Sequence, residues 1–146
     1  MRWILLAFTL LVLTGAGAGY GDIDAGRDTD PLTLAKAFCA ARLGDGDMSR
    51  LAPWYAPKLK HVLASAGSGP VPWQSRNLKP DRCEPEVLYG QDDIIGVLVR
   101  LSYVAGAEHW ADTLNFQRTP TSWLLNNVLY ETGGNLRFRL FETSSD

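Results

Sequence analysis

The chain has 146 residues, of which 46% are hydrophobic and 21% charged, and its formal net charge is −2 at pH 7. This length suits one domain, and the balanced charge argues against nucleic acid as a partner, because phosphate binding depends on clustered Lys and Arg. The two cysteines and two histidines are not paired at the short spacing of structural zinc sites, so no metal site and no cofactor is predicted.

The first 18 residues have the three parts of a secretory signal peptide. Arg2 supplies a positive charge, residues 4–13 form an apolar block, and small residues end at Ala18. A transmembrane helix or a buried helix is the alternative, but a span needs about 20 apolar residues and this block is shorter. We therefore expect cleavage after Ala18, a periplasmic or secreted location, and no membrane span in the mature chain.

A flexible segment and a helix are expected to follow. Residues 19–29 are small and acidic without periodicity, so we expect them to be flexible. Asp30 is a suitable helix N-cap, Pro31 suits a first helical turn, and Gly44 is typical of a helix end. Apolar residues cover a wide arc of this helix, residues 30–43, which predicts that it is mostly buried.

Two shorter helical pieces are expected at residues 48–52 and 57–65. The acidic turn before them, residues 44–47, lacks the ligand spacing and the closing Glu of a helix–loop–helix calcium site. In the second piece, His61 falls on the side opposite the apolar residues, so we expect it to be solvated.

Both cysteines lie in the part of the chain that would be exported. An even number of cysteines in an oxidising compartment indicates a disulfide between Cys39 and Cys83. Such a bond would join the first helix to the segment that enters the sheet. A pair of free thiols is the alternative.

A long connection precedes the predicted sheet. Residues 67–82 are rich in Gly, Ser and Pro and surround Trp73. Connections of this length in a compact domain are usually functional or disordered. Trp73 could close the open end of a pocket, contact a partner or cap the core.

The last third of the chain has the alternation of apolar and polar residues that is typical of antiparallel strands. The predicted strands cover residues 84–89, 96–104, 109–118 and 122–130. The tail, residues 136–141, alternates like a strand but is also compatible with a last helical turn. The elements predict an α+β fold with N-terminal helices packed into a curved antiparallel sheet, in one domain of residues 30–146.

Two stretches resemble the nuclear-transport-factor-2-like superfamily. The first helix followed by residues 51–59 is similar to its helical start, and residues 123–130 resemble its recurring late strand. The resemblance covers nearly all of the mature chain, is greatest to small exported bacterial members of unassigned function, and implies a cone that often encloses a pocket. Catalytic members are isomerases and dehydratases with an Asp base; here Asn126 and Asn127 occupy a late-strand position that is often acidic.

Asp112 is the one carboxylate that strand alternation directs into the interior, on a face it shares with three core-like residues. Desolvation there would make it a candidate base. Tyr55, Tyr103 and Asn127 are candidate pocket-lining residues that could donate hydrogen bonds to a developing oxyanion. Alternatively, Asp112 is hydrogen-bonded at a strand end, or a bulge turns it outward.

We therefore expect an exported, non-enzymatic binding domain that recognises a small apolar ligand or a protein partner. Trp54, Tyr55 and Trp73 are the predicted partner-contact residues, because aromatic side chains carry much of the binding energy at interfaces. A specific version of this hypothesis is the neutralisation of an exported toxin by plugging its active site. The alternative is a small-molecule isomerase or dehydratase that uses Asp112 as its base.

Overall fold

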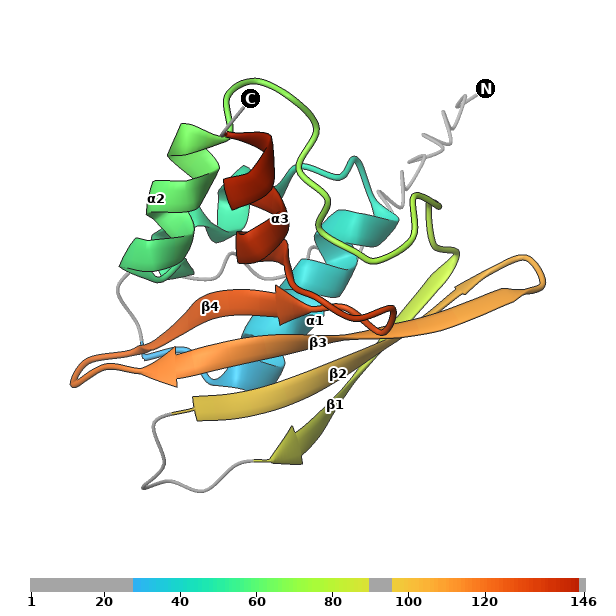
Figure 1. Ribbon diagram of the computed structural model, residues 1–146. Helices are drawn as coiled ribbons and strands as arrows, with labels where there is room; N and C mark the ends of the chain where they lie inside the picture. Colours follow the sequence, from blue (N-terminus) through green and yellow to red (C-terminus); the bar gives the residue numbers. More distant parts are fainter. Residues whose placement is uncertain (1–27, 90–95, 145–146) are drawn as a thin grey trace, which may run out of the picture.

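The structure, a computed structural model, describes residues 28–89 and 96–144 (Figure 1). Four antiparallel strands form an open sheet in the order β1-β2-β3-β4, and the helices pack against it. The predicted α+β fold is confirmed. The predicted signal peptide and most of the predicted flexible segment lie outside the described residues.

The strands span Arg82–Tyr89 (β1), Gly96–Ala105 (β2), Glu108–Arg118 (β3) and Trp123–Leu129 (β4). Alternate residues of β2 from Val97 to Tyr103 are buried, while Arg100 and Ser102 on the other face are exposed. The central part of β3 alternates in the same way. Because the apolar face is covered and the polar face is not, the period of two in the sequence matches the burial, and the strand predictions are confirmed with small shifts at the ends.

A β-bulge interrupts the pairing of β3 with β4. Asn115 pairs with Asn127, whereas Phe116 pairs with Leu125, so Asn126 is an extra residue on β4. The extra residue shifts the alternation of β4 by one position. For this reason the strand supplies core residues both before and after the bulge.

The first helix, α1, spans Pro31–Leu43 and ends at Gly44, as predicted. Asp30 is its N-cap and accepts a backbone hydrogen bond of 3.0 Å from the first turn. Leu34 and Phe38 are buried, and α1 runs across the sheet against β1 and β2 (Figure 1). The wide apolar arc of this helix therefore faces the core.

The remaining helical elements are the 3₁₀ helix η1 (Met48–Trp54), α2 (Pro57–Ser65) and α3 (Leu136–Thr143). The tail of the chain is thus a helix, which decides between the two alternatives of the sequence analysis. Asn135 caps α3 by accepting a 3.0 Å hydrogen bond from the Phe138 N–H, and Leu136 and Leu140, one turn apart, are both buried.

None of the helices in the described part of the chain has the length and apolar character that crossing a bilayer requires. The longest of them, α1, has 13 residues.

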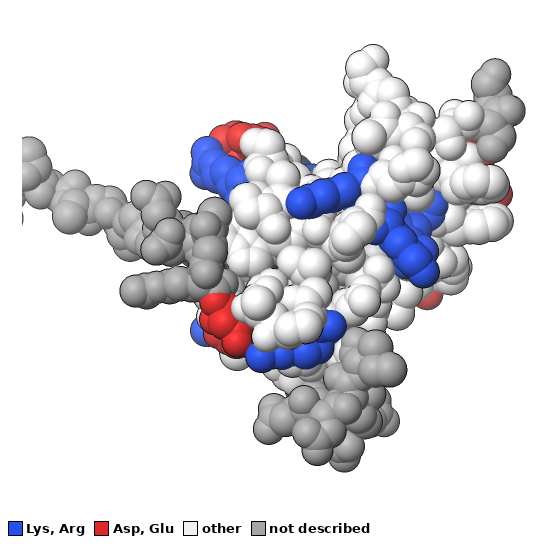
Figure 2. Space-filling view, turned by 90° about the vertical axis from the view of Figure 1, so that its left-hand side faces the viewer, with Lys and Arg blue, Asp and Glu red and all other residues white. Residues whose placement is uncertain are grey.

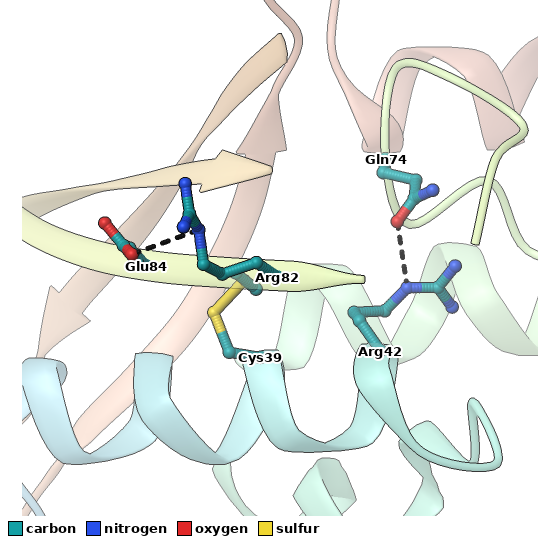
Figure 3. Close-up of a disulfide and its surroundings, with 6 residues drawn as sticks. Cys39, Arg42, Gln74, Arg82 and Glu84 are labelled. Atoms are coloured by element: carbon teal, nitrogen blue, oxygen red, sulfur yellow. Dashed lines mark hydrogen bonds and ion pairs between the residues drawn. A yellow bond between two sulfur atoms is a disulfide. The ribbon is translucent and has the colours of Figure 1, made fainter. Parts of the chain in front are cut away.

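A disulfide joins Cys39 of α1 to Cys83 of β1 (Figure 3). The two Cα atoms are 5.5 Å apart, and the residues are separated by 44 positions in the sequence. The predicted pairing is confirmed, and the free-thiol alternative is wrong for this structure. The bond connects the first helix to an edge strand of the sheet.

Candidate functional site

The predicted base, Asp112, is buried in the middle of β3, where the residue is 1% exposed. Its Oδ2 atom accepts a hydrogen bond of 2.8 Å from the backbone N–H of Ser75, and its Oδ1 atom one of 3.1 Å from that of Glu131. These N–H groups belong to the connection before β1 and to the turn after β4. Asp112 thus links two distant segments to the sheet. Of the alternatives given above, the hydrogen-bonded carboxylate is the one observed, although Asp112 lies in the middle of its strand and not at an end.

Buried polar groups surround this carboxylate. The ring of Tyr103 stacks on that of Trp110 with the centroids 5.0 Å apart, and burial, together with the negative charge of Asp112, raises the pKa of the Tyr103 phenol. Among the described residues, the hydroxyl groups of Tyr103 and Ser75 and the indole N–H of Trp110 have no hydrogen-bond partner. Hydrogen-bond donors without partners are therefore present near Asp112, but the raised pKa of Tyr103 makes its phenol a poor acid.

Tyr103 and Trp110 line an open hollow of about 280 Å³, whereas Asp112 and Ser75 are not among its lining residues. A void between the helices and the sheet has a volume of about 10 Å³ and is lined by core residues such as Phe38, Trp54 and Phe116. This volume is about that of a single water probe, whereas ligand pockets measure roughly 300–1,000 Å³. The void is a packing defect in an apolar core.

The three predicted pocket-lining residues do not converge on one cavity. The Tyr55 hydroxyl donates a 2.6 Å hydrogen bond to the carbonyl oxygen of Met48. Asn127 Oδ1 accepts a 3.1 Å hydrogen bond from the Arg137 N–H, which links β4 to α3. Of the two tyrosines, Tyr103 has a pKa raised by burial and by the charge of Asp112, whereas that of Tyr55 is raised by burial and by Asp47. The oxyanion arrangement that the sequence suggested is not assembled.

The predicted partner-contact residues need a correction. Trp54, Tyr55 and Trp73 are only 4%, 5% and 7% exposed and belong to the core. Trp73 packs edge to face on Phe38, with ring centroids 6.0 Å apart, and its ring centroid is 5.5 Å from that of Tyr55. Of the three alternatives for Trp73, the structure shows core capping, so these aromatics do not form a contact surface.

Polar contacts hold the connection that carries Trp73. Arg42 Nε of α1 donates a 3.2 Å hydrogen bond to Gln74 Oε1 (Figure 3), and the Tyr130 hydroxyl donates one of 2.5 Å to the carbonyl oxygen of Pro72. These partners are distant in the sequence, so no local signal could have revealed them. The long connection is an anchored cover over one end of the core.

A polar hollow of about 280 Å³ lies on the face of the sheet opposite the described helices. Its charged and polar lining comes from β1, β2, β3 and the turn after β4, and includes Arg82, Glu84, Arg100, His109 and Glu131. Arg82 Nε and Glu84 Oε1 form an ion pair at 3.2 Å. The hollow therefore carries both signs of charge. The sequence analysis missed this hollow because its residues lie on different strands and come together only through the strand register.

An exposed aromatic surface lies on α3. Phe138 and Phe141 are 57% and 63% exposed, while Leu136 and Leu140 on the other side of the helix are buried. The helix packs beside α2 (Figure 1). Figure 2 views the side of the molecule that carries α2 and shows several groups of basic side chains across this face, with acidic side chains at its edge. The sequence analysis did not predict this surface because it left open whether the tail is a strand or a helix.

Within residues 28–89 and 96–144, no group of three or more His, Cys, Asp or Glu side chains is arranged to hold a metal ion. Comparisons of the chain with known protein families, curated proteins and solved structures found no match. A fold by itself does not define a function, which depends on the residues of a site and their geometry.

Proposed function

We propose that this chain is an exported binding domain that recognises a protein partner through its outer surface. The observation that carries the proposal is the geometry of Asp112. A general base must come within hydrogen-bonding reach of the proton it removes. Asp112 is 1% exposed, and each of its oxygens already accepts a backbone N–H. This geometry supports a structural role for the carboxylate and not the isomerase or dehydratase alternative.

The packing of the interior favours a protein partner over a small apolar ligand. The aromatic residues that could have lined a pocket, Tyr55 and Trp73, contact each other in the core. The nearby void of about 10 Å³ would not admit a ligand. Exposed aromatic side chains are found on α3 instead. Recognition is thus proposed to take place on the outside of the molecule.

The disulfide supports the proposed location, because such bonds persist in oxidising compartments outside the cytosol. The order of helices followed by antiparallel strands supports the proposal that the chain is a member of the nuclear-transport-factor-2-like superfamily. Toxin neutralisation is a specific version of partner binding, and the identity of the partner would decide it.

The experiment uses the exported, disulfide-bonded chain as bait in a periplasmic extract of its source. We expect a specific protein to bind it, to be identified by mass spectrometry, and to bind again after separate purification. A chain that has been reduced and alkylated serves as the control, because any protein that still binds to it does not require the native fold. Native mass spectrometry of the purified chain tests the alternative, namely that the chain binds a small molecule. A small molecule that the folded chain retains would overturn the proposal in favour of a ligand-binding or enzymatic role.

A further inference from the structure

We infer that the exposed surfaces of α2 and α3 form the docking surface for an acidic protein partner, with Phe138 as its central anchor. This inference rests on the proposed function and adds to it the place of contact and the charge of the partner. The two helices lie beside each other on the helical side of the molecule (Figure 1).

The first observation is a charge asymmetry. Together α2 and α3 contain four basic residues and one acidic residue, namely Lys58, Lys60, Arg137, Arg139 and Glu142. The rest of the described chain contains eight basic and ten acidic residues. A protein whose formal net charge is −2 thus concentrates positive charge on one pair of helices. This concentration of positive charge attracts acidic protein surfaces and increases their rate of association.

The second observation is that this charge is not neutralised by ion pairs within the described residues. The four ion pairs found there join Arg50 to Asp45, Arg76 to Glu108, Arg82 to Glu84 and Arg118 to Asp28. Lys58 and Lys60 are exposed on α2. On α3, Arg137 Nη1 donates to the amide oxygen of Asn126, and Arg139 lies over the ring of Tyr130, which are neutral partners. The exposed charges of Lys58, Lys60 and Arg139 therefore remain available to a partner, whereas Arg137 is half-buried.

The third observation is an exposed aromatic side chain on α3, Phe138, which lies between Arg137 and Arg139 in the sequence and one turn before Glu142. Phe138 is 57% exposed on the side of α3 that faces away from Leu136 and Leu140. Phe141, three residues further, lies on the same side of the helix and is 63% exposed. A large apolar side chain surrounded by charged residues has the arrangement of an interface anchor and its rim. The partner is expected to offer an apolar pocket edged by carboxylates.

Two other surfaces fit less well. The hollow on the opposite sheet face combines Arg82 and Arg100 with Glu84 and Glu131, so its charge selects neither an acidic nor a basic partner. An anionic membrane would also attract the basic helices. However, α3 has eight residues and buries Leu136 and Leu140 in the core, which leaves little apolar area for insertion between lipids.

The test places a photoreactive phenylalanine analogue at position 138 in one version of the full exported chain and at position 100, in the opposite hollow, in another. Both are irradiated in the periplasmic extract. We expect position 138 to cross-link one acidic protein, and salt to reduce the yield because exposed charges are screened. With that protein purified, Phe138→Ala is expected to weaken binding about tenfold or more, as for an interface anchor.

Charge variants provide the matched comparison. Lys58→Glu with Lys60→Glu is expected to slow association, most strongly at low salt, whereas Arg100→Glu with Ser102→Glu on the opposite face leaves the affinity within about twofold. Circular dichroism and the intact disulfide mass check that each variant folds.

Four outcomes would overturn the inference. A partner that cross-links at position 100 but not at 138 would leave the proposed function standing and remove this docking surface. No cross-link at either position would remove this docking surface, and the absence of a partner for the bait as well would remove the proposed function. A cross-link between two copies of the chain would replace the acidic partner by self-association. Finally, Phe138-dependent sedimentation with phosphatidylglycerol vesicles would replace it by a lipid surface.

Discussion

Asp112 shows how the partners of a residue decide its role. Two backbone N–H groups hold the carboxylate in the interior, and no cationic side chain of the described residues forms an ion pair with it. Hydrogen bonds to an ionised acceptor are stronger than those between neutral groups, so they offset part of the cost of burying the charge. Burial of Asp112 also keeps a substrate from reaching its carboxylate oxygens.

We expect Asp112→Asn to lower the free energy of unfolding by about 2–4 kcal/mol, because the amide presents a donor to a backbone N–H at a buried site. Urea unfolding followed by tryptophan fluorescence measures the change. Asp81→Asn is the matched control, since Asp81 accepts a 2.8 Å hydrogen bond from the Gly106 N–H in an exposed loop. Its effect is expected to stay within about 1 kcal/mol. Equal losses in both variants would contradict the structural role of Asp112.

Three buried tyrosines predict sensitivity to alkali. Burial raises the pKa of Tyr55 and Tyr103, and it raises that of Tyr130 to about 12. An unfolded tyrosine ionises near pH 10. Between about pH 10 and 12 the unfolded state therefore loses protons that the folded state keeps, so stability falls as pH rises and is fully present below that window.

We expect each of these tyrosines to contribute a slope of up to about 1.4 kcal/mol per pH unit in that window. Urea midpoints measured at increasing pH test this, with tyrosinate absorbance as a second signal. Tyr130→Phe should make the decline less steep. A decline that begins well below pH 10, or one that Tyr130→Phe leaves unchanged, would show that other groups cause it.

At the scale of elements, the disulfide connects two segments that would otherwise meet only through packing. It joins α1 to β1, an edge strand with one hydrogen-bonded neighbour in the sheet. The same helix also anchors the long connection through Arg42 and Gln74 (Figure 3). The end of α1 therefore organises the start of the sheet.

Reduction of the disulfide should lower the free energy of unfolding by about 3–4 kcal/mol in the chain-entropy account, because the bond closes a long loop. Urea unfolding with and without reductant measures the loss, and a mass increase of two hydrogens verifies reduction. The double variant Cys39→Ala with Cys83→Ala should reproduce the effect without reductant. Unchanged stability in both experiments would mean that packing alone holds α1 against β1.

At the scale of the whole molecule, one core joins all the helices to the sheet. Residues of α1, η1, α2, α3 and the strands β2, β3 and β4 belong to the same buried cluster. Trp73 in the connection before β1 belongs to it as well. Because no element has a separate core among the described residues, unfolding should be cooperative.

We expect tryptophan fluorescence and far-ultraviolet circular dichroism to report the same urea midpoint. Trp73→Phe removes the reporter in the long connection, and the remaining fluorescence transition should still coincide with the loss of secondary structure. An earlier fluorescence transition that disappears in Trp73→Phe would show that the connection opens separately from the rest of the molecule.

Two features show where prediction from the sequence reached its limit. The tail from Leu136 was compatible with a strand or a helix because it is short, and its helix depends on the burial of Leu136 and Leu140 against other elements. Trp73 lies in a segment rich in Gly, Ser and Pro, and the sequence left pocket closure, partner contact and core capping open. Contacts with Phe38 and Tyr55 place it in the core instead.

The sequence by itself determined the elements with local signals: the N-cap Asp30, the alternation of the strands, and the pairing of Cys39 with Cys83, the only cysteines in the chain. Only the tertiary structure decided what Asp112 does, because its hydrogen-bond partners are 37 and 19 positions away. Capping and alternation act between near neighbours in the chain. Burial and access depend on segments that meet only when the chain has folded.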